Sequence, residues 1–92
     1  MPNKRDIVWS NESLRQIKII KKNQPEAQKY MQKIAMLIDD IQKSPFKGLG
    51  KPEPLKHKYE GCWSRRINIQ DRLIYRVENK EIQIISILGH YN

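Results

Sequence analysis

A chain of 92 residues is long enough for one small domain, and we expect a single domain over residues 1–92. Eighteen Lys and Arg against ten Asp and Glu give a formal net charge of +8, which favours an anionic partner such as nucleic acid or an acidic protein. A single cysteine, Cys62, excludes an intrachain disulfide, and without a signal peptide or a long apolar run we expect a cytoplasmic protein with no membrane partner.

The first half of the chain predicts a short strand followed by two helices. Residues 6–9 are rich in β-forming side chains, and Ser10 after them is a suitable N-cap for a helix that ends near Asn23. Pro25 suits the first position of a second helix. That helix has the clearest apolar period of the chain, at Ala27, Met31, Ile34, Ile38 and Ile41. Because the connection between them is short, the two helices should form an antiparallel hairpin.

The stretch from Gly48 to Arg66 is where the residue types are most suited to chemistry. Its glycines and prolines exclude a long helix, and Glu53 lies between two prolines that fix its backbone. Residues 43–76 hold nine basic and three acidic side chains, so most of the net charge gathers around this carboxylate. A rigid acid among cations suits a general base acting on an anionic substrate. An ordinary solvated Glu in a basic surface loop is the other interpretation.

The second half of the chain predicts strands at 55–59, 62–68, 72–77 and 82–88. In the third of these, Leu73, Tyr75 and Val77 point to one face and Arg72, Ile74 and Arg76 to the other. A three-residue connection would put Arg66 on the same face as Arg72, and a two-residue connection would put Arg65 there instead. Otherwise Arg65 makes a structural pair or lies at the sheet rim, and Cys62 is a packed residue rather than a nucleophile.

These elements predict an α+β fold, β-α-α followed by an antiparallel meander. Two helices can cover only one face of the sheet, so the face that carries the arginines should be left for a partner. No Asp, Glu and His cluster has the spacing of metal ligands, so we expect no metal and no cofactor.

Four motifs resemble the YoeB/Txe toxins of the RelE-like superfamily: K-P-E-P-L-K-H (51–57), W-S-R-R-I (63–67), D-R-L-I-Y (71–75) and the terminal H-Y (90–91). The resemblance runs from about Ile7 to Tyr91. It implies a RelE-like fold and the toxin of a type II toxin–antitoxin system, an endoribonuclease that cleaves mRNA in the ribosomal A site. The activity implied is metal-independent general acid–base catalysis that inhibits translation.

The resemblance also implies roles for particular residues. Glu53 corresponds to the general base, Arg72 to the residue that stabilises the phosphate, His90 to the general acid and Tyr91 to a residue that orients the RNA. The basic residues implied to contact the RNA are Lys51, Lys56 and Arg66. Without the resemblance, the terminal position of His90 favours a frayed residue without a role, and Tyr91 could equally pack on the sheet edge.

The implied partners are mRNA on the ribosome, with the 30S A site and its 16S rRNA, and a YefM/Axe-like antitoxin. Operator DNA is implied only through the antitoxin complex, and a homodimer is implied by the resemblance alone. Two alternatives remain: a non-catalytic toxin of the same superfamily fold, and a nucleic-acid-binding module that acts by binding alone.

Overall fold

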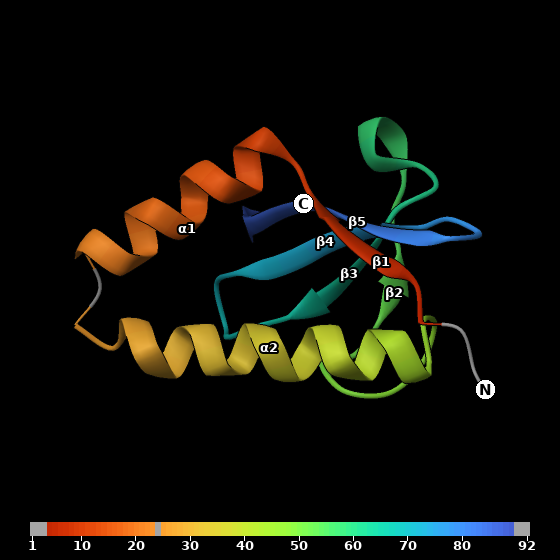
Figure 1. Ribbon diagram of the computed structural model, residues 1–92. Helices are drawn as coiled ribbons and strands as arrows, with labels where there is room; N and C mark the ends of the chain where they lie inside the picture. The colour runs from red at the N-terminus through yellow and green to blue at the C-terminus, as the bar shows by residue number, and fades with distance from the viewer. Residues whose placement is uncertain (1–3, 24, 90–92) are drawn as a thin grey trace.

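The fold is a five-stranded sheet with two helices, and the computed structural model describes residues 4–23 and 25–89. The elements in chain order are β1 (Asp6–Trp9), α1 (Asn11–Asn23), α2 (Ala27–Lys43), β2 (Glu53–Pro54), a 3-10 turn (His57–Tyr59), β3 (Trp63–Arg66), β4 (Arg72–Val77) and β5 (Glu81–Gly89). The strand order across the sheet is β1-β5-β4-β3-β2, in which β1 is parallel to β5 and the other pairs are antiparallel (Figure 1). The predicted α+β order of strand, two helices and antiparallel meander is confirmed.

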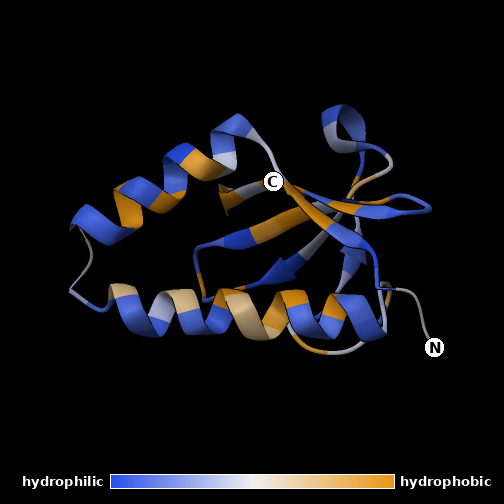
Figure 2. Ribbon diagram, viewed as in Figure 1, coloured by the Kyte–Doolittle hydropathy of each residue, from blue (hydrophilic) through white to orange (hydrophobic). Residues whose placement is uncertain are grey.

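The helix boundaries follow from local chemistry. The Ser10 hydroxyl accepts a hydrogen bond from the Ser13 N–H at 2.9 Å, so the predicted N-cap of α1 is confirmed. The predicted first position of α2 at Pro25 is wrong, because Glu26 is the N-cap and the helix begins at Ala27. Hydrophobic and hydrophilic positions alternate along both helices with the helical period (Figure 2). Among the described residues, no helix is both long enough and apolar enough to cross a membrane.

The main core lies between the two helices and one face of the sheet. Its buried side chains are Ile20 of α1, Ile34, Leu37 and Ile41 of α2, and Ile67, Leu73, Tyr75, Ile82, Ile84 and Ile87 of the sheet side. Burial of each large aliphatic side chain contributes about 1.5–3 kcal/mol relative to its exposure, so this cluster is the main apolar source of stability. Both helices therefore cover the same face, as the sequence predicts.

The opposite face of the sheet is more covered than the sequence predicts. The strand expected at 55–59 is wrong, because strand pairing falls on Glu53–Pro54 and His57–Tyr59 form a 3-10 turn. The segment after β2 folds over the sheet, where Leu55 and Cys62 bury Ile74 completely. The part of this face that carries Arg66 and Arg72 stays open toward a partner.

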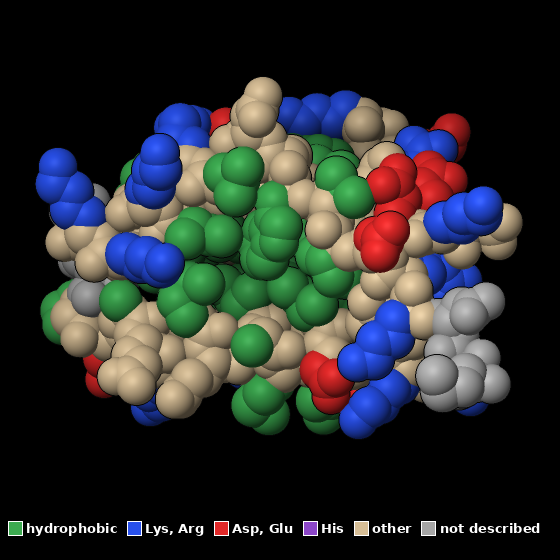
Figure 3. Space-filling view, viewed as in Figure 1, with side chains coloured by type: hydrophobic (Ala, Val, Ile, Leu, Met, Phe, Trp, Pro, Cys, Tyr) green, Lys and Arg blue, Asp and Glu red, His purple; other side chains and the backbone are tan. Residues whose placement is uncertain are grey.

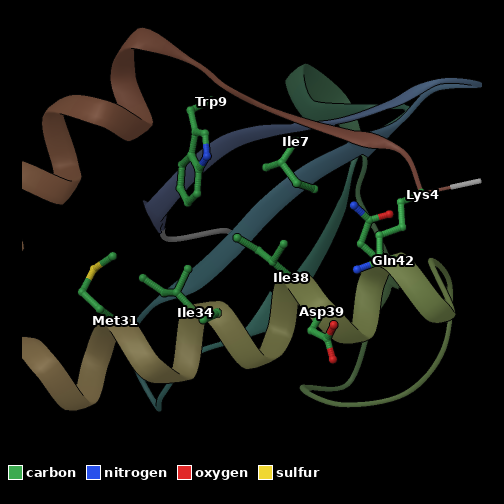
Figure 4. Close-up of a pocket in the computed structure, with 9 residues that line it drawn as sticks. Lys4, Ile7, Trp9, Met31, Ile34, Ile38, Asp39 and Gln42 are labelled. Atoms are coloured by element: carbon green, nitrogen blue, oxygen red, sulfur yellow. The ribbon is translucent and has the colours of Figure 1, made fainter.

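An open apolar groove of about 380 Å³ lies between β1 and α2. Figure 3 shows hydrophobic side chains gathered in this hollow, with charged side chains around it. In Figure 4, Ile7 and Trp9 of β1 face Met31, Ile34 and Ile38 of α2 across the groove. The groove lies at the β1 edge, whereas β2 forms the other edge of the sheet.

Candidate functional site

Glu53 is positioned by a two-residue edge strand. It pairs with Ser64 of β3, and Leu55 donates its N–H to the Cys62 carbonyl at 2.9 Å just beyond the pair. The flanking prolines limit the backbone to extended conformations, which suit an edge strand. The side chain of Glu53 is 52% exposed, and its Oε1 accepts a hydrogen bond from the guanidinium of Arg72 at 2.7 Å.

Two cations share the sheet face of Glu53. The β3–β4 register sets Arg66 opposite Arg72, and directly paired residues of antiparallel strands point to the same face. Arg66 is exposed, whereas the side chain of Arg72 is 21% exposed. An ion pair with a second guanidinium beside it is a suitable surface for a phosphodiester, since Arg presents donors that match phosphate oxygens.

The two lysines expected at the site flank Glu53 in sequence. Lys51 is exposed and has a left-handed backbone, with φ of 52°. It follows Gly50, whose carbonyl accepts a hydrogen bond from the Arg66 N–H at 2.7 Å. Lys56 is exposed and immediately precedes the 3-10 turn. Both lysines therefore present a positive charge to solvent near the edge strand.

The predicted residues His90 and Tyr91 lie outside the described residues. The last described residue, Gly89 of β5, pairs with Arg72 of β4. The register of β4 and β5 shifts before that point, and Gln16 of α1 accepts hydrogen bonds from the N–H groups of Ile87 (2.7 Å) and Leu88 (3.2 Å). A polar residue in the buried stripe of α1 was the only sequence signal for this support, and sequence reasoning missed it.

Ser64 of β3 is paired with Glu53 of β2. It is fully buried, and its hydroxyl has no hydrogen-bond partner among the residues that the structure describes. A buried hydroxyl without a partner loses its hydration energy, so such groups are uncommon in folded proteins. Ser64 is the cross-strand neighbour of Glu53, and directly paired residues of antiparallel strands point to the same face.

Arg65 does not join the site. It points to the helix side of β3, is fully buried, and bonds to Asp40 of α2 at 2.5 Å, which is the structural pair that the sequence left open. The Leu49 N–H and the Arg65 guanidinium lower the pKa of the Asp40 carboxyl below its usual range. The pair is thus ionised at neutral pH, and one of the nine cations of residues 43–76 is neutralised inside the protein.

Cys62 is also a structural residue, as expected. It is buried beside Leu55 and Ile74, and burial raises the pKa of its thiol, which opposes formation of the nucleophilic thiolate. Within residues 4–23 and 25–89, no three His, Cys, Asp or Glu side chains gather in a way that could hold a metal ion.

Comparison with known proteins agrees with the fold and with the motifs. The family model of the YoeB-like toxin of bacterial type II toxin–antitoxin systems matches residues 9–91. The chain is similar to toxin YoeB of Escherichia coli K12, with 40% identity over 85 residues that cover 92% of this chain and 98% of that toxin. It is also similar to the YoeB dimer from Staphylococcus aureus, with a TM-score of 0.85, 35% identity, and coverage of 96% of this chain and 99% of that one. The YoeB–YefM complex from the same organism gives a TM-score of 0.81 at 35% identity, with the same coverage. The chain therefore belongs to the YoeB family of toxins of bacterial type II toxin–antitoxin systems.

Proposed function

We propose that this toxin is an endoribonuclease that cleaves mRNA in the ribosomal A site and so inhibits translation. The observation that carries the proposal is the Glu53–Arg72 ion pair, which lies partly exposed on the open part of the sheet face in a chain of this family. A base and a phosphate-binding cation at hydrogen-bond distance are what RNA cleavage requires of a protein that uses acid–base catalysis.

The proposed reaction needs no metal. Glu53 removes the proton of the 2′-hydroxyl, the 2′-oxygen forms a bond to phosphorus, and the bond to the 5′-oxygen breaks. Arg72 stabilises the negative charge that develops on the phosphate oxygens. His90 protonates the departing 5′-oxygen, and Tyr91 orients the RNA, as aromatic side chains do by stacking on unpaired bases.

Arg72 has to change partners during this reaction. Its guanidinium donates to Glu53 when no substrate is bound, and a phosphodiester that enters the site competes for the same donor. Release of Glu53 from Arg72 frees the carboxylate to act as a base. The Ser64 hydroxyl, which has no partner among the described residues, can then donate to Glu53 and keep it in place.

The exposed cations around the pair bind the RNA backbone. Lys51, Lys56 and Arg66 neutralise phosphates of the mRNA and of the 16S rRNA that surrounds it in the 30S A site. The same surface suits an acidic or amphipathic segment of a YefM/Axe-like antitoxin, which folds on binding and covers the site. A related YoeB forms a complex with YefM and another is a dimer, which supports an antitoxin partner and a homodimer here. Operator DNA is contacted only through the antitoxin complex.

Primer extension on translating ribosomes tests the proposal. The wild-type chain should produce cuts within the codon in the A site, and free mRNA should stay intact. His90→Gln should abolish cleavage while ribosome binding is kept, because it removes the proton donor alone. A chain that ends at Gly89 should behave in the same way. Translation arrest without any cut in the mRNA would refute the nuclease and favour a toxin that acts by binding.

A further inference from the structure

The loop that leads to Glu53 wraps around one buried guanidinium. Arg65 is fully buried, and its side chain uses all five of its N–H donors. Nε donates to the Tyr75 hydroxyl at 3.2 Å, and one Nη donates to the Asp40 carboxylate. The remaining donors reach three carbonyls of the loop, those of Ser44 (2.6 Å), Leu49 (3.0 Å) and Lys47 (3.1 Å).

Two further groups fasten the same loop to this centre. The Asp40 carboxylate that holds Arg65 also accepts the Leu49 N–H at 2.9 Å. The Tyr75 hydroxyl donates to the Pro45 carbonyl at 2.7 Å. Three side chains, Asp40 of α2, Arg65 of β3 and Tyr75 of β4, thus bond to the backbone of four loop residues: Ser44, Pro45, Lys47 and Leu49. The loop therefore has little freedom to move as a unit.

The fixed loop passes directly into the edge strand. The Gly50 carbonyl accepts the Arg66 N–H, and three residues later Glu53 takes its place opposite Ser64. A strand of two residues has few hydrogen bonds of its own, so its position depends on the segments on either side. The side before Glu53 is the loop that Arg65 holds.

We propose that Arg65 and Asp40 are positioning residues for Glu53, an inference that rests on the proposed role of Glu53 as a base. They lie on the other face of the sheet and touch no substrate. Their function is to fix the loop over residues 44–50 so that the carboxylate of Glu53 meets Arg72 and the RNA at the distance that proton transfer needs. Lys could not replace Arg65, because a single ammonium cannot reach five acceptors that are spread around a planar guanidinium.

The pair can be weakened without touching the open face. Asp40→Asn keeps the size of the side chain and leaves the buried Arg65 charge without a counter-charge, which disfavours the closed loop. Asp39→Asn is the matched control, because Asp39 is the adjacent residue of α2 and pairs only with the exposed Lys43 among the described residues. Tyr75→Phe is a milder second variant, since it removes the hydroxyl that joins Arg65 to the loop and keeps the core ring.

The first measurement is made on the free protein. NMR spectra should show faster amide exchange over residues 44–50 and shifted signals of the Glu53 backbone and the Arg72 guanidinium in Asp40→Asn and Tyr75→Phe. The second measurement is single-turnover cleavage on programmed ribosomes. Both variants should lower the rate constant at saturation by about 10- to 100-fold, the size expected for a small displacement of a catalytic group, with half-saturation within about twofold of wild type. Asp39→Asn should match wild type in both.

The outcomes separate the two hypotheses. Unchanged exchange and unchanged Glu53 signals in a folded Asp40→Asn would overturn the positioning role, as would a loosened loop with a wild-type cleavage rate. If Asp40→Asn does not fold, Tyr75→Phe is judged by the same two criteria. If the wild-type chain never cleaves mRNA, the proposed nuclease activity is refuted. The positioning of Glu53 is then tested by the NMR signals alone.

Discussion

At the residue scale, the ion pair of Glu53 and Arg72 contributes little to the stability of the fold, and its proposed role is chemical. The carboxylate is half exposed, and exposed ion pairs typically contribute about 0–1 kcal/mol because water and salt screen them. The two residues nevertheless come from strands separated by β3 and meet at 2.7 Å. Substitution of either residue should therefore leave the fold intact and report on function.

Glu53→Gln should lower the cleavage rate roughly 10²- to 10⁴-fold, the usual contribution of a general base. Arg72→Ala should lower it at least about 10²-fold, as expected for loss of one donor to the transition-state charge. The double variant should lose less than the product of the two effects, because both residues serve one step. Single-turnover kinetics and thermal melts measure this, with Glu60→Gln, another exposed Glu between β2 and β3, as the control. Full activity in a folded Glu53→Gln would remove the base from the mechanism.

The Cys62 thiol gives a second residue-scale prediction, which concerns pH. Its pKa is raised by burial, so at neutral pH the folded protein holds less thiolate than the unfolded chain. The stabilisation from keeping the thiol neutral is complete at neutral pH and is lost as the pH rises through the raised pKa. Alkylation of Cys62 by iodoacetamide at about pH 8 should thus be slow in buffer and fast in urea. In urea the thiol is exposed and has its ordinary pKa of about 8.5, so part of it is thiolate at this pH. Equal rates in both would contradict the buried position.

At the element scale, the loop over residues 44–50 shows where sequence reasoning stops. The order of the helices and strands and the N-cap at Ser10 follow from periodicity and local chemistry, and the structure bears them out. The burial of Arg65 could not be predicted, because it depends on a loop that returns over β3 with a geometry set by two glycines of positive φ. The short strand at Glu53 was missed for a similar reason: the flanking prolines favour an extended backbone, but the pairing with β3 that makes it a strand cannot be read from the sequence.

Gly48→Ala tests how tightly this loop is packed. An added Cβ would lie 2.2 Å from the Asp40 carboxylate, at a backbone φ of +121°. Gly61→Ala is the matched control, because it has a similar positive φ of +92° but its nearest new contact is 3.8 Å away on the flexible Arg76 side chain. Gly61→Ala should lower the free energy of unfolding by more than about 1 kcal/mol, through the unfavourable backbone conformation alone, and Gly48→Ala should lower it clearly more. Urea unfolding measures both, and equal losses would show that the loop yields without strain.

At the scale of the whole molecule, the positive charge is divided between an open surface and the interior. Arg65 is paired with Asp40 inside, whereas Lys51, Lys56 and Arg66 are exposed near Glu53. The candidate site itself could be predicted only in part from residues: the sequence indicated Glu53 and left open which arginine would accompany it. The register of β3 against β4 sets Arg66 opposite Arg72. Sequence patterns within each strand do not determine how two strands pair.

Binding to programmed 30S subunits should weaken steeply as salt rises, because each phosphate contact releases counterions. Lys51→Gln should reduce the slope of log affinity against log salt by about 1 if Lys51 contacts a phosphate. Lys21→Gln is the control, an exposed lysine in the last turn of α1. A slope that Lys51→Gln leaves unchanged would remove this residue from the RNA-binding surface.

The place of β5 in the sheet has a consequence for how the toxin is made. This strand follows every other element in the sequence, yet it lies between β1 and β4, and β1 pairs with it in parallel across more than 70 residues. Non-local pairing of this kind forms slowly, and it cannot begin before the last strand has been synthesised. The partner of Arg72 on β5 is Gly89, so Arg72 gains this neighbour only after residue 89 has left the ribosome that made the chain. Under the proposed function, a growing chain does not present the complete site before β5 has joined the sheet.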